Sequence, residues 1–568
     1  MRGAWLLLCA LLGGCSSCEP AASDRAPEPT EAEAEAIYAE YAVATEHPRA
    51  AAAGAEILAA GGNAADAAAA TLLALGVLRP GSSGLGGGGF ALYYRASDRS
   101  LTHLDFREEA PAAAHADMFG EDPEASRAGG LSVGVPGEPA GIEALLERFG
   151  SGRVDRRAVA APAIRIAEGG WEASALTAHY ASIFADALRT DGVFGAWFPD
   201  GEARIPEGAR LTNPALARSL RAFAEEGAAP FMRGAIARTL VTEVTARRGL
   251  LTMDDLAAYE VRAREPLRAD AYGFTWVAPG PPSAGGHTLL TSLALLERWL
   301  PTPTDDAALR HALIESWKGP YRDRREALGD PDHVDVPLAR LRAPARLDAR
   351  AARFDPARAQ PTEAWALPLE ATASSVPGAE GGTSHVCVVD AEGNVASVTT
   401  SINLGFGARF SAAGYALNDQ LDDFARPGGE PNAFGLRGGA PNLPGPGRRP
   451  VSSATPLIVL RDGVPVLCAG GSGGSRIITA TEHAALLALV LGRSPADAVA
   501  SRRVHHQGDP DDVLVEEGLD PELVRGLGAR GHLMTRVSNL AAVQLIRIDE
   551  DGLRPASDAR TTGGVAGR

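Results

Sequence analysis

A threonine that follows two glycines could supply both a nucleophile and a base. The segment Gly381-Gly382-Thr383-Ser384-His385 leads from a glycine-rich stretch into a pattern typical of a strand. If the peptide bond before Thr383 were cut, this residue would carry a hydroxyl nucleophile and a new α-amine to accept its proton. The spacing alone indicates such a nucleophile only weakly, because a threonine at the start of a strand usually has a structural role.

A second motif offers a serine nucleophile. Residues 470–474 read Gly-Gly-Ser-Gly-Gly and match G-x-S-x-G, with a predicted strand at Val464–Ala469 before them and a helical pattern at Arg476–Leu491 after them. Ser472 would then need an acid and a histidine downstream. The earlier part of the chain lacks the regular alternation of strands and helices of that hydrolase fold, but the interpretation stays open. The candidate partners are Asp511, Asp512, His505, His506 and His532.

A third motif, at residues 84–89, matches the dinucleotide fingerprint G-x-G-x-x-G, and Asp105 follows about twenty residues later. That fingerprint requires a strand before the glycines and a helix after them. Here the predicted order is helix, loop and strand, so we expect tight backbone packing rather than nucleotide binding. No group of histidine, cysteine and acidic residues has metal-ligand spacing, so we expect no metal and no organic cofactor.

The elements that must position these motifs divide into two parts. The first part of the chain is rich in helical patterns and the second in hairpin patterns, which predicts sheets flanked by helices. Helices are predicted within Ala50–Leu78, with a break at Gly61-Gly62-Asn63, and over Glu138–Phe149, Asp155–Glu168, Pro214–Glu226, Gly234–Arg248, Thr288–Leu300 and Asp306–Leu328. Strands are predicted at Phe90–Tyr94, His385–Asp390, Val395–Ile402, Pro456–Leu460 and Val464–Ala469, and on both sides of Asp549–Gly552.

The first residues predict an exported lipoprotein. A basic start precedes the apolar run Ala4–Leu12, which is too short to span a bilayer and ends in small residues before Cys15. This pattern predicts a signal over residues 1–14 and lipidation of Cys15; a plain secretory signal is the alternative. The acidic segment 15–36 is typical of a tether. We expect a bacterial envelope protein, and Ser16 favours the outer membrane facing the periplasm.

Composition limits the remaining possibilities. Among 568 residues, 71 are acidic and 54 are Lys or Arg, which gives a net charge of −17 and disfavours a nucleic-acid partner. Five cysteines are too few for a disulfide scaffold. Cys387 and Cys468 lie in apolar runs, so we predict buried thiols rather than a bridge.

From about Ala42 to its end, the chain resembles the γ-glutamyltransferases, which are N-terminal-nucleophile hydrolases. The resemblance depends on many short motifs that occur in one order through both halves of the sequence. They are Ala60–Ala68, Ser82–Phe90, Asp105–Glu108, Gly134–Glu138, Gly329–Asp332, Ser401–Asn403, Asn418–Phe424, Arg449–Ser453 and Gly473–Ile478.

The resemblance implies a fold and an activity. The fold is an α+β protein of the αββα sandwich type. The chain would cut itself between Gly382 and Thr383 and remain together as a heterodimer of a large chain, 37–382, and a small catalytic chain, 383–568. Its substrates would be γ-glutamyl amides such as glutathione, and the glutamyl group would pass to water, an amino acid or a dipeptide. No cofactor is implied.

The resemblance also assigns roles to individual residues. Thr383 is the implied nucleophile, Ser401 a hydroxyl that assists it, and Gly473 and Gly474 the donors of an oxyanion hole. The implied substrate-binding residues are Arg107, Ser452 and Ser453 for the α-carboxylate and Asp423, Gln420 and Asn403 for the α-ammonium.

One departure from the family pattern concerns a lid. Segment 428–447 resembles the loop that covers the glutamyl pocket in many relatives, but Phe434 stands where a tyrosine commonly bonds the residue equivalent to Asn403. The balance between water and amine acceptors therefore stays open. So does a non-enzymatic alternative, in which the uncut chain serves as an envelope binding protein.

Overall fold

The structure is a computed structural model that describes residues 36–120, 122–200, 202–366 and 381–568. The predicted signal, Cys15 and nearly all of the predicted tether lie outside the described residues. Within those residues, no helix is both long enough and apolar enough to cross a membrane.

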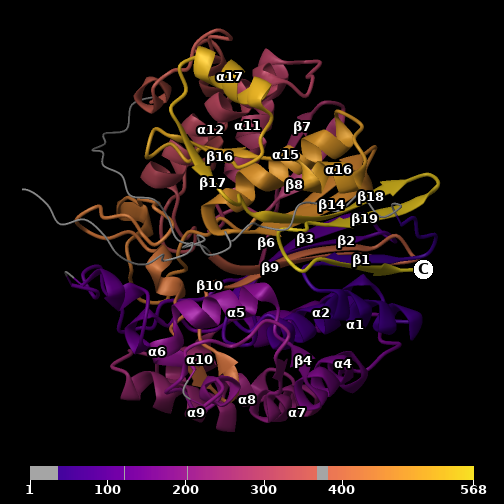
Figure 1. Cartoon of the computed structure of the whole chain (residues 1–568), viewed down its shortest axis with the longest axis vertical. Helices are drawn as coiled ribbons and strands as arrows, with labels where there is room; N and C mark the ends of the chain where they lie inside the picture. The colour runs from indigo at the N-terminus through magenta and orange to yellow at the C-terminus, as the bar shows by residue number, and fades with distance from the viewer. Residues whose placement is uncertain (1–35, 121, 201, 367–380) are drawn as a thin grey trace, which may run out of the picture.

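Two stacked β-sheets form the centre of the molecule and lie between two layers of helices (Figure 1). The first sheet runs β20 (Gly564–Gly567), β1 (Ala42–Thr45), β9 (Gly381–Val389), β10 (Val395–Leu404), β2 (Gly88–Arg95), β3 (Ser100–Phe106) and β6 (Arg262–Arg264). The second runs β19 (Gly552–Ser557), β18 (Ala542–Asp549), β14 (Val464–Ser472), β13 (Leu457–Arg461), β8 (Phe274–Ala278) and β7 (Leu267–Ala271). The layers therefore have the αββα order that the resemblance implied.

The helices divide between the outer faces of the two sheets (Figure 1). On the first sheet lie α1 (Pro48–Ala59), α2 (Ala64–Leu78), α4 (Arg156–Gly169), α5 (Ala175–Ile183), α6 (Ala185–Leu188), α7 (Pro214–Glu226), α8 (Ala229–Met232), α9 (Ala235–Ala246) and α10 (Met253–Ala258). On the second lie α11 (Gly285–Trp299), α12 (Ala307–Ala327), α15 (Ile477–Leu489), α16 (Pro495–Ala500) and α17 (Pro521–Ala529). The others are α3 (Glu138–Phe149), α13 (Leu338–Leu341) and α14 (Pro344–Ala351).

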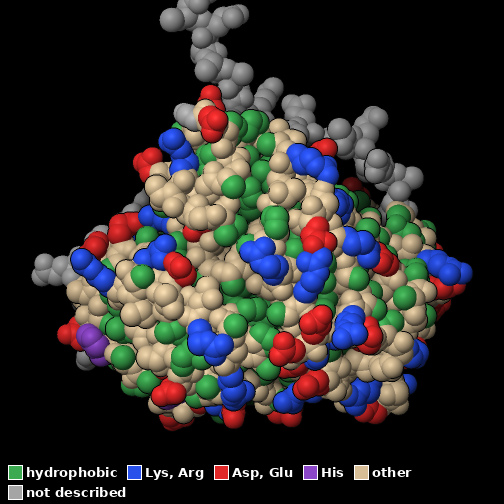
Figure 2. Space-filling model, turned by 90° about the horizontal axis from the view of Figure 1, so that it is seen from below, with side chains coloured by type: hydrophobic (Ala, Val, Ile, Leu, Met, Phe, Trp, Pro, Cys, Tyr) green, Lys and Arg blue, Asp and Glu red, His purple; other side chains and the backbone are tan. Residues whose placement is uncertain are grey.

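Small sheets complete the fold. They are β15 (Val504–His505) with β16 (Val513–Glu516) and β17 (Met534–Val537), β11 (Ser411–Ala412) with β12 (Tyr415–Ala416), and β4 (Trp171–Glu172) with β5 (Arg210–Leu211). Figure 2 shows the outer face of the helices that cover the first sheet, where basic and acidic side chains are interspersed.

Local sequence explains where the buried helix α2 begins. Asn63 accepts hydrogen bonds from the backbone N–H groups of Ala65 and Asp66, and the Asp66 carboxylate accepts one from the Asn63 N–H at 3.0 Å. This reciprocal cap fixes the start of α2 and separates it from α1. The alanine-rich helix that follows is buried along nearly its whole length, because small side chains allow close packing on the sheet.

The glycine loop before β2 packs as the sequence analysis predicted. It follows a helix and precedes a strand, the reverse of a dinucleotide site. A Cβ atom on Gly86 would lie 2.1 Å from the carbonyl oxygen of Ala416, and one on Gly87 would lie 2.2 Å from that of Ser401. Side chains are therefore excluded there by neighbouring backbone.

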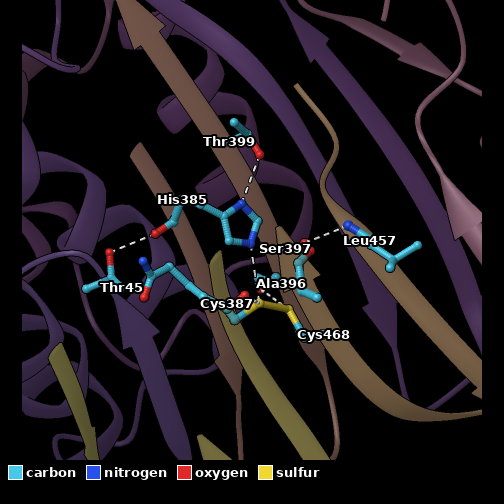
Figure 3. The surroundings of a disulfide bond; sticks show 10 residues. Thr45, His385, Cys387, Ala396, Ser397, Thr399, Leu457 and Cys468 are labelled. Carbon is cyan, nitrogen blue, oxygen red and sulfur yellow. Dashed lines mark hydrogen bonds between the residues drawn. A yellow bond between two sulfur atoms is a disulfide. The ribbon is translucent and has the colours of Figure 1, made fainter. Parts of the chain in front are cut away.

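The prediction that Cys387 and Cys468 are free thiols is wrong. They form a disulfide, with their Cα atoms 5.9 Å apart, between β9 of the first sheet and β14 of the second (Figure 3). Side chains on one face of each strand point into the layer between the sheets, so these two cysteines meet although 81 positions separate them in sequence. His385 lies beside the bridge, with Nδ1 2.9 Å from Thr399 Oγ1 and Nε2 3.3 Å from Cys387 Sγ.

Candidate active site

Thr383 is the third residue of β9 and is only 4% exposed. The antiparallel register of β9 and β10 places Ser401 opposite it, and the two side-chain oxygens are 3.1 Å apart. Ser401 Oγ donates a hydrogen bond of 2.8 Å to the carbonyl oxygen of Gly382. Since a serine has one hydroxyl proton, Thr383 is the donor in the bond between the two hydroxyls. Ser401 thus polarises the carbonyl that directly precedes the threonine.

The predicted oxyanion glycines form a turn between β14 and α15. Gly473 and Gly474 have φ angles of 133° and 62°, a conformation that favours glycine. A Cβ atom on Gly474 would lie 2.5 Å from the ring of Phe434, so the site has no room for a side chain there. A Cβ atom built on Gly381 would be 3.0 Å from the backbone nitrogen of Gly474. This N–H group therefore lies beside the backbone that leads to Thr383.

The predicted substrate residues line a single cavity with the nucleophile. This cavity, called here the glutamyl pocket, is open to solvent and has about 320 Å³ of empty space. Gly473 does not line it. Its walls are formed by Arg107, Thr383, Ser401, Asn403, Gln420, Asp423, Phe434, Ser452, Ser453, Ala454, Gly474 and Ile477.

A buried ion pair lines the glutamyl pocket. Arg107 Nη2 lies 2.5 Å from Asp423 Oδ2, and Gln420 Nε2 donates to the same oxygen at 2.9 Å. Gln420 also donates to Asn403 Oδ1 at 3.2 Å. Asn432 donates to Asp423 Oδ1 at 2.9 Å, a contact that the sequence did not predict. The pocket thus holds one positive and one negative group in fixed positions.

A second acid close to Arg107 was also missed. Glu108 is fully buried, with Oε2 3.6 Å from Arg107 Nη1. Its burial raises the pKa of the carboxyl group to about 7, although the neighbouring guanidinium opposes this shift. The charge near Arg107 therefore changes at neutral pH.

The segment that leads to Ser452 and Ser453 and the predicted lid are hydrogen-bonded to Arg107 and Asp423, respectively. Arg107 Nε donates to the carbonyl of Pro450 at 3.2 Å, which holds the segment leading to Ser452 and Ser453. In the lid segment, 428–447, Asn442 donates to the carbonyl of Asp423 at 2.8 Å. Phe434 covers the pocket with a ring that lacks a hydroxyl, as its sequence position implied.

Ser472 lacks the arrangement of a serine hydrolase. It ends a strand of an antiparallel sheet, and each candidate histidine has another partner: His505 bonds Thr479 and Gln507, His506 bonds Asp511, and His532 bonds His311. In the part of the chain that the structure describes, no hydrogen bond joins Ser472 to any of them.

Among the described residues, two groups of side chains have the composition of metal ligands, but both are otherwise engaged. His385, Cys387 and Cys468 form one group, in which the cysteines share a disulfide. The other group contains His311 and His532, whose rings hydrogen-bond at 2.7 Å, and Glu315, which pairs with Lys318. Neither group adjoins the glutamyl pocket.

Comparisons with known proteins agree with this geometry. The family model described as gamma-glutamyltranspeptidase matches residues 50–568. The glutathione hydrolase proenzyme of Escherichia coli K12 is 35% identical over 89% of this chain and 88% of its own length, and that of Bacillus subtilis 168 is 32% identical over 92% and 91%.

Among solved structures, a cephalosporin acylase from Bacillus halodurans superposes with a TM-score of 0.83 at 26% identity and covers 96% of this chain and 98% of its own. The γ-glutamyltranspeptidase of Helicobacter pylori gives a TM-score of 0.54 at 30% identity, over 59% of this chain and 96% of its own.

Proposed function

Because the chain belongs to the gamma-glutamyltranspeptidase family, we propose that Thr383 is the nucleophile of a γ-glutamyl hydrolase and transferase that first cuts its own chain. The observation that carries this proposal is the contact of Ser401 with both Thr383 Oγ1 and the carbonyl oxygen of Gly382. The same hydroxyl can thus orient the nucleophile and polarise the bond to be cut.

Self-cleavage would begin with attack of Thr383 Oγ1 on the carbonyl carbon of Gly382. The bond to the Thr383 nitrogen breaks as the ester bond to Oγ1 forms, and the nitrogen takes up the hydroxyl proton. Water then hydrolyses the ester, which leaves a carboxylate on Gly382 and a free α-amine on Thr383. Ser401 stabilises the charge that develops on the carbonyl oxygen.

Turnover would use the same hydroxyl and the new amine. Thr383 Oγ1 attacks the γ-carbonyl of the substrate while the α-amine accepts its proton and passes it to the departing amine. The backbone N–H groups of Gly473 and Gly474 would stabilise the tetrahedral oxyanion, each by about 3 kcal/mol. Water or another amine then takes the glutamyl group from the threonine.

The donor would bind by replacing an internal ion pair. Its α-carboxylate would bind the Arg107 guanidinium together with Ser452 and Ser453. Its α-ammonium would bind Asp423, supported by Gln420 and Asn403. Since Arg107 and Asp423 already bond each other at 2.5 Å, a zwitterion satisfies both groups at once.

Glutathione is the donor that the relatives' names suggest. The cephalosporin acylase neighbour raises a competing possibility, an acyl donor other than a γ-glutamyl amide. The contacts of Gln420 and Asn432 with Asp423 favour a donor that carries the ammonium, because they hold the carboxylate in the pocket.

We also propose that the chain is a bacterial envelope lipoprotein, anchored through Cys15 with residues 15–36 as its tether. The sequence pattern of the first residues supports this. Replacing Cys15 by Ser should move the protein from the membrane fraction to the soluble fraction; continued membrane binding would contradict the proposal.

The first experiment is Thr383→Ala, scored for chain cleavage and for p-nitroaniline release from γ-glutamyl-p-nitroanilide. We expect an uncut chain and no release, whereas Thr383→Ser should retain slower cleavage because it keeps a hydroxyl. Cleavage or release in Thr383→Ala would overturn the proposal.

Two controls separate the alternatives. A serine hydrolase would lose all activity in Ser472→Ala, whereas we expect that variant to release p-nitroaniline. A binding protein would leave the wild-type chain intact and release nothing.

A further inference from the structure

A groove that the proposed mechanism does not use lies at one edge of the second sheet. Its lining residues come from the last strand of that sheet, β7, from α11, and from the two short helices α13 and α14. The strand and α11 lie close together in the upper part of Figure 1. The groove is open to solvent and has about 800 Å³ of empty space, and it shares no lining residue with the glutamyl pocket. We call it the edge groove.

Much of the edge groove is apolar. Leu290 and Ala294 lie one turn apart on α11 and line it. Three residues of α13 and α14 line it as well, namely Leu338, Pro344 and Leu347. Leu347 is half-buried but is not among the residues that pack into the hydrophobic clusters of the core. An apolar ligand that covers this surface removes it from water, which favours binding.

Two arginines that line the edge groove lack an acidic partner. Arg268 is an exposed residue of β7, and no hydrogen bond or ion pair joins its side chain to another described residue. Arg342 follows α13, and its Nη2 donates to a neutral group, the backbone carbonyl of Arg268, at 2.6 Å. No Asp or Glu among the described residues lines the groove. The groove therefore holds two positive charges that are not paired with an acid.

Neighbouring arginines differ from these two. Arg346 and Arg350 of α14 both pair with Asp323, at 2.8 Å and 2.7 Å. Arg342 is half-buried, and burial lowers the pKa of its guanidinium group without an acid nearby to oppose the shift. An anion that binds beside Arg342 would supply the counter-charge that Asp323 supplies to the other two.

The edge of β7 could instead accept a peptide as an added strand. This strand pairs with β8 on one side only, so its other side has no strand neighbour among the described residues. However, the bond from Arg342 to the carbonyl of Arg268 uses a backbone acceptor that an added strand would need. The groove is therefore better suited to a small ligand than to a peptide strand.

We infer that the edge groove binds an amphipathic carboxylate, that is, a carboxylate on an apolar chain such as a medium-chain fatty acid. The carboxylate would bind Arg268 and Arg342, and the chain would lie along Leu290, Ala294 and Leu347. A cavity of this size, mostly apolar with a few charged groups, is typical of small-molecule sites. The inference does not depend on the proposed reaction, because the two cavities are separate.

The test is isothermal titration calorimetry of the whole protein with three probes. Octanoate has both the charge and the chain, octanol has only the chain, and acetate has only the charge. The proteins are the wild type, Arg268→Gln, Arg342→Gln, Leu347→Gln and a control, Arg340→Gln, which changes an exposed arginine of α13 that does not line the groove. Arg268 is exposed, so its replacement leaves the core intact even if another variant fails to fold.

We expect the wild type to bind octanoate about tenfold more tightly than octanol, the worth of one charge-assisted hydrogen bond, and to give no measurable heat with acetate. Arg268→Gln and Arg342→Gln should each raise Kd for octanoate about tenfold, Leu347→Gln should raise it about threefold, and Arg340→Gln should leave it unchanged. Absence of octanoate binding to the wild type, equal affinity for octanol, or an unchanged Kd in Arg268→Gln would overturn the inference.

Discussion

The glutamyl pocket and a second cavity, lined by Arg79, Gly381 and Gly473 among others and called here the Arg79 cavity, both contain a buried arginine, but they differ in the position of its counter-charge. In the glutamyl pocket, Asp423 lines the same cavity as Arg107 and bonds it directly. In the Arg79 cavity, Glu46 lies 3.2 Å from Arg79 Nη2 but does not line the cavity. Among the described residues, side chains of both charges therefore line the first cavity, whereas the charged side chains that line the second are arginines that already have partners.

This difference indicates that the position of a buried counter-charge can predict the charge of a ligand. A zwitterion that enters the glutamyl pocket exchanges one ion pair for two, so neither protein group is left unpaired. In the Arg79 cavity, the acids Glu46 and Glu516 already pair with the lining arginines Arg79 and Arg560 without lining the cavity themselves. The position of the acid relative to the cavity wall, rather than the presence of arginine, separates the two kinds of site.

The largest expected effect comes from removing the negative charge of the glutamyl pocket. Asp423→Asn should lower kcat/KM for γ-glutamyl-p-nitroanilide about a hundredfold or more, because the donor's ammonium loses its partner and Arg107 loses its counter-charge. Release of p-nitroaniline measures this effect. Glutaryl-p-nitroanilide, which lacks the ammonium, serves as the matched control and should lose far less. An equal loss for both donors would mean that Asp423 only maintains the fold.

A smaller effect is expected when the positive charge at position 107 is kept but the geometry of the charged group is changed. Arg107→Lys retains one charge and loses the paired geometry of the guanidinium, so KM for the donor should rise about tenfold. Steady-state kinetics on the anilide would measure this. A KM equal to that of the wild type would show that the α-carboxylate is held elsewhere.

Donor binding in the glutamyl pocket should depend on pH through Glu108, which lies beside Arg107. Glu108, with a pKa of about 7, is neutral below that pH and becomes a carboxylate beside Arg107 above it, where it competes with the donor. Between pH 6 and pH 8, KM should rise about threefold more in the wild type than in Glu108→Gln.

The same group affects stability. Its pKa is raised from the ordinary 4.5, so the folded state binds more protons than the unfolded state between about pH 4.5 and 7. The wild type should therefore lose stability relative to Glu108→Gln as the pH rises through this window, and thermal denaturation would show it. Parallel melting curves for the two proteins at all pH values would contradict the assignment.

The smallest effect is expected at the lid. Phe434→Tyr adds a hydroxyl to a ring that already covers the glutamyl pocket, so the rate with water should change only about twofold. The ratio of transfer to hydrolysis, measured with glycylglycine as acceptor, would show whether the added hydroxyl tightens the lid. A tenfold loss of activity would indicate that the ring has no room to accept it.

Much of the fold could be predicted from local patterns. The helices at Glu138–Phe149 and Pro214–Glu226 have their predicted bounds, because a proline near each start and a glycine after each end fix their limits. The hairpin of β9 and β10 also follows from its alternating residues and turn. The substrate residues could be named because their motifs resemble a family, although single residues such as Arg107 carry no such signal.

Contacts between distant segments could not be predicted. Cys387 and Cys468 looked like ordinary core thiols because each lies in an apolar run, and only the stacking of the sheets brings them together. Asn432 and the pair of Glu46 with Arg79 were missed for the same reason: each depends on elements that are remote in sequence.

The strand order of the first sheet has a consequence for how the molecule can be assembled. A cut before Thr383 would place β1 in the large chain, yet β1 pairs on one side with Val386–Val389 of β9 and on the other with β20, and all of these partners belong to the small chain. The disulfide joins two residues of the small chain and would leave the two chains without a covalent link through it. The two pieces would thus share a sheet that neither can complete alone, so either piece made by itself should not reach the native fold.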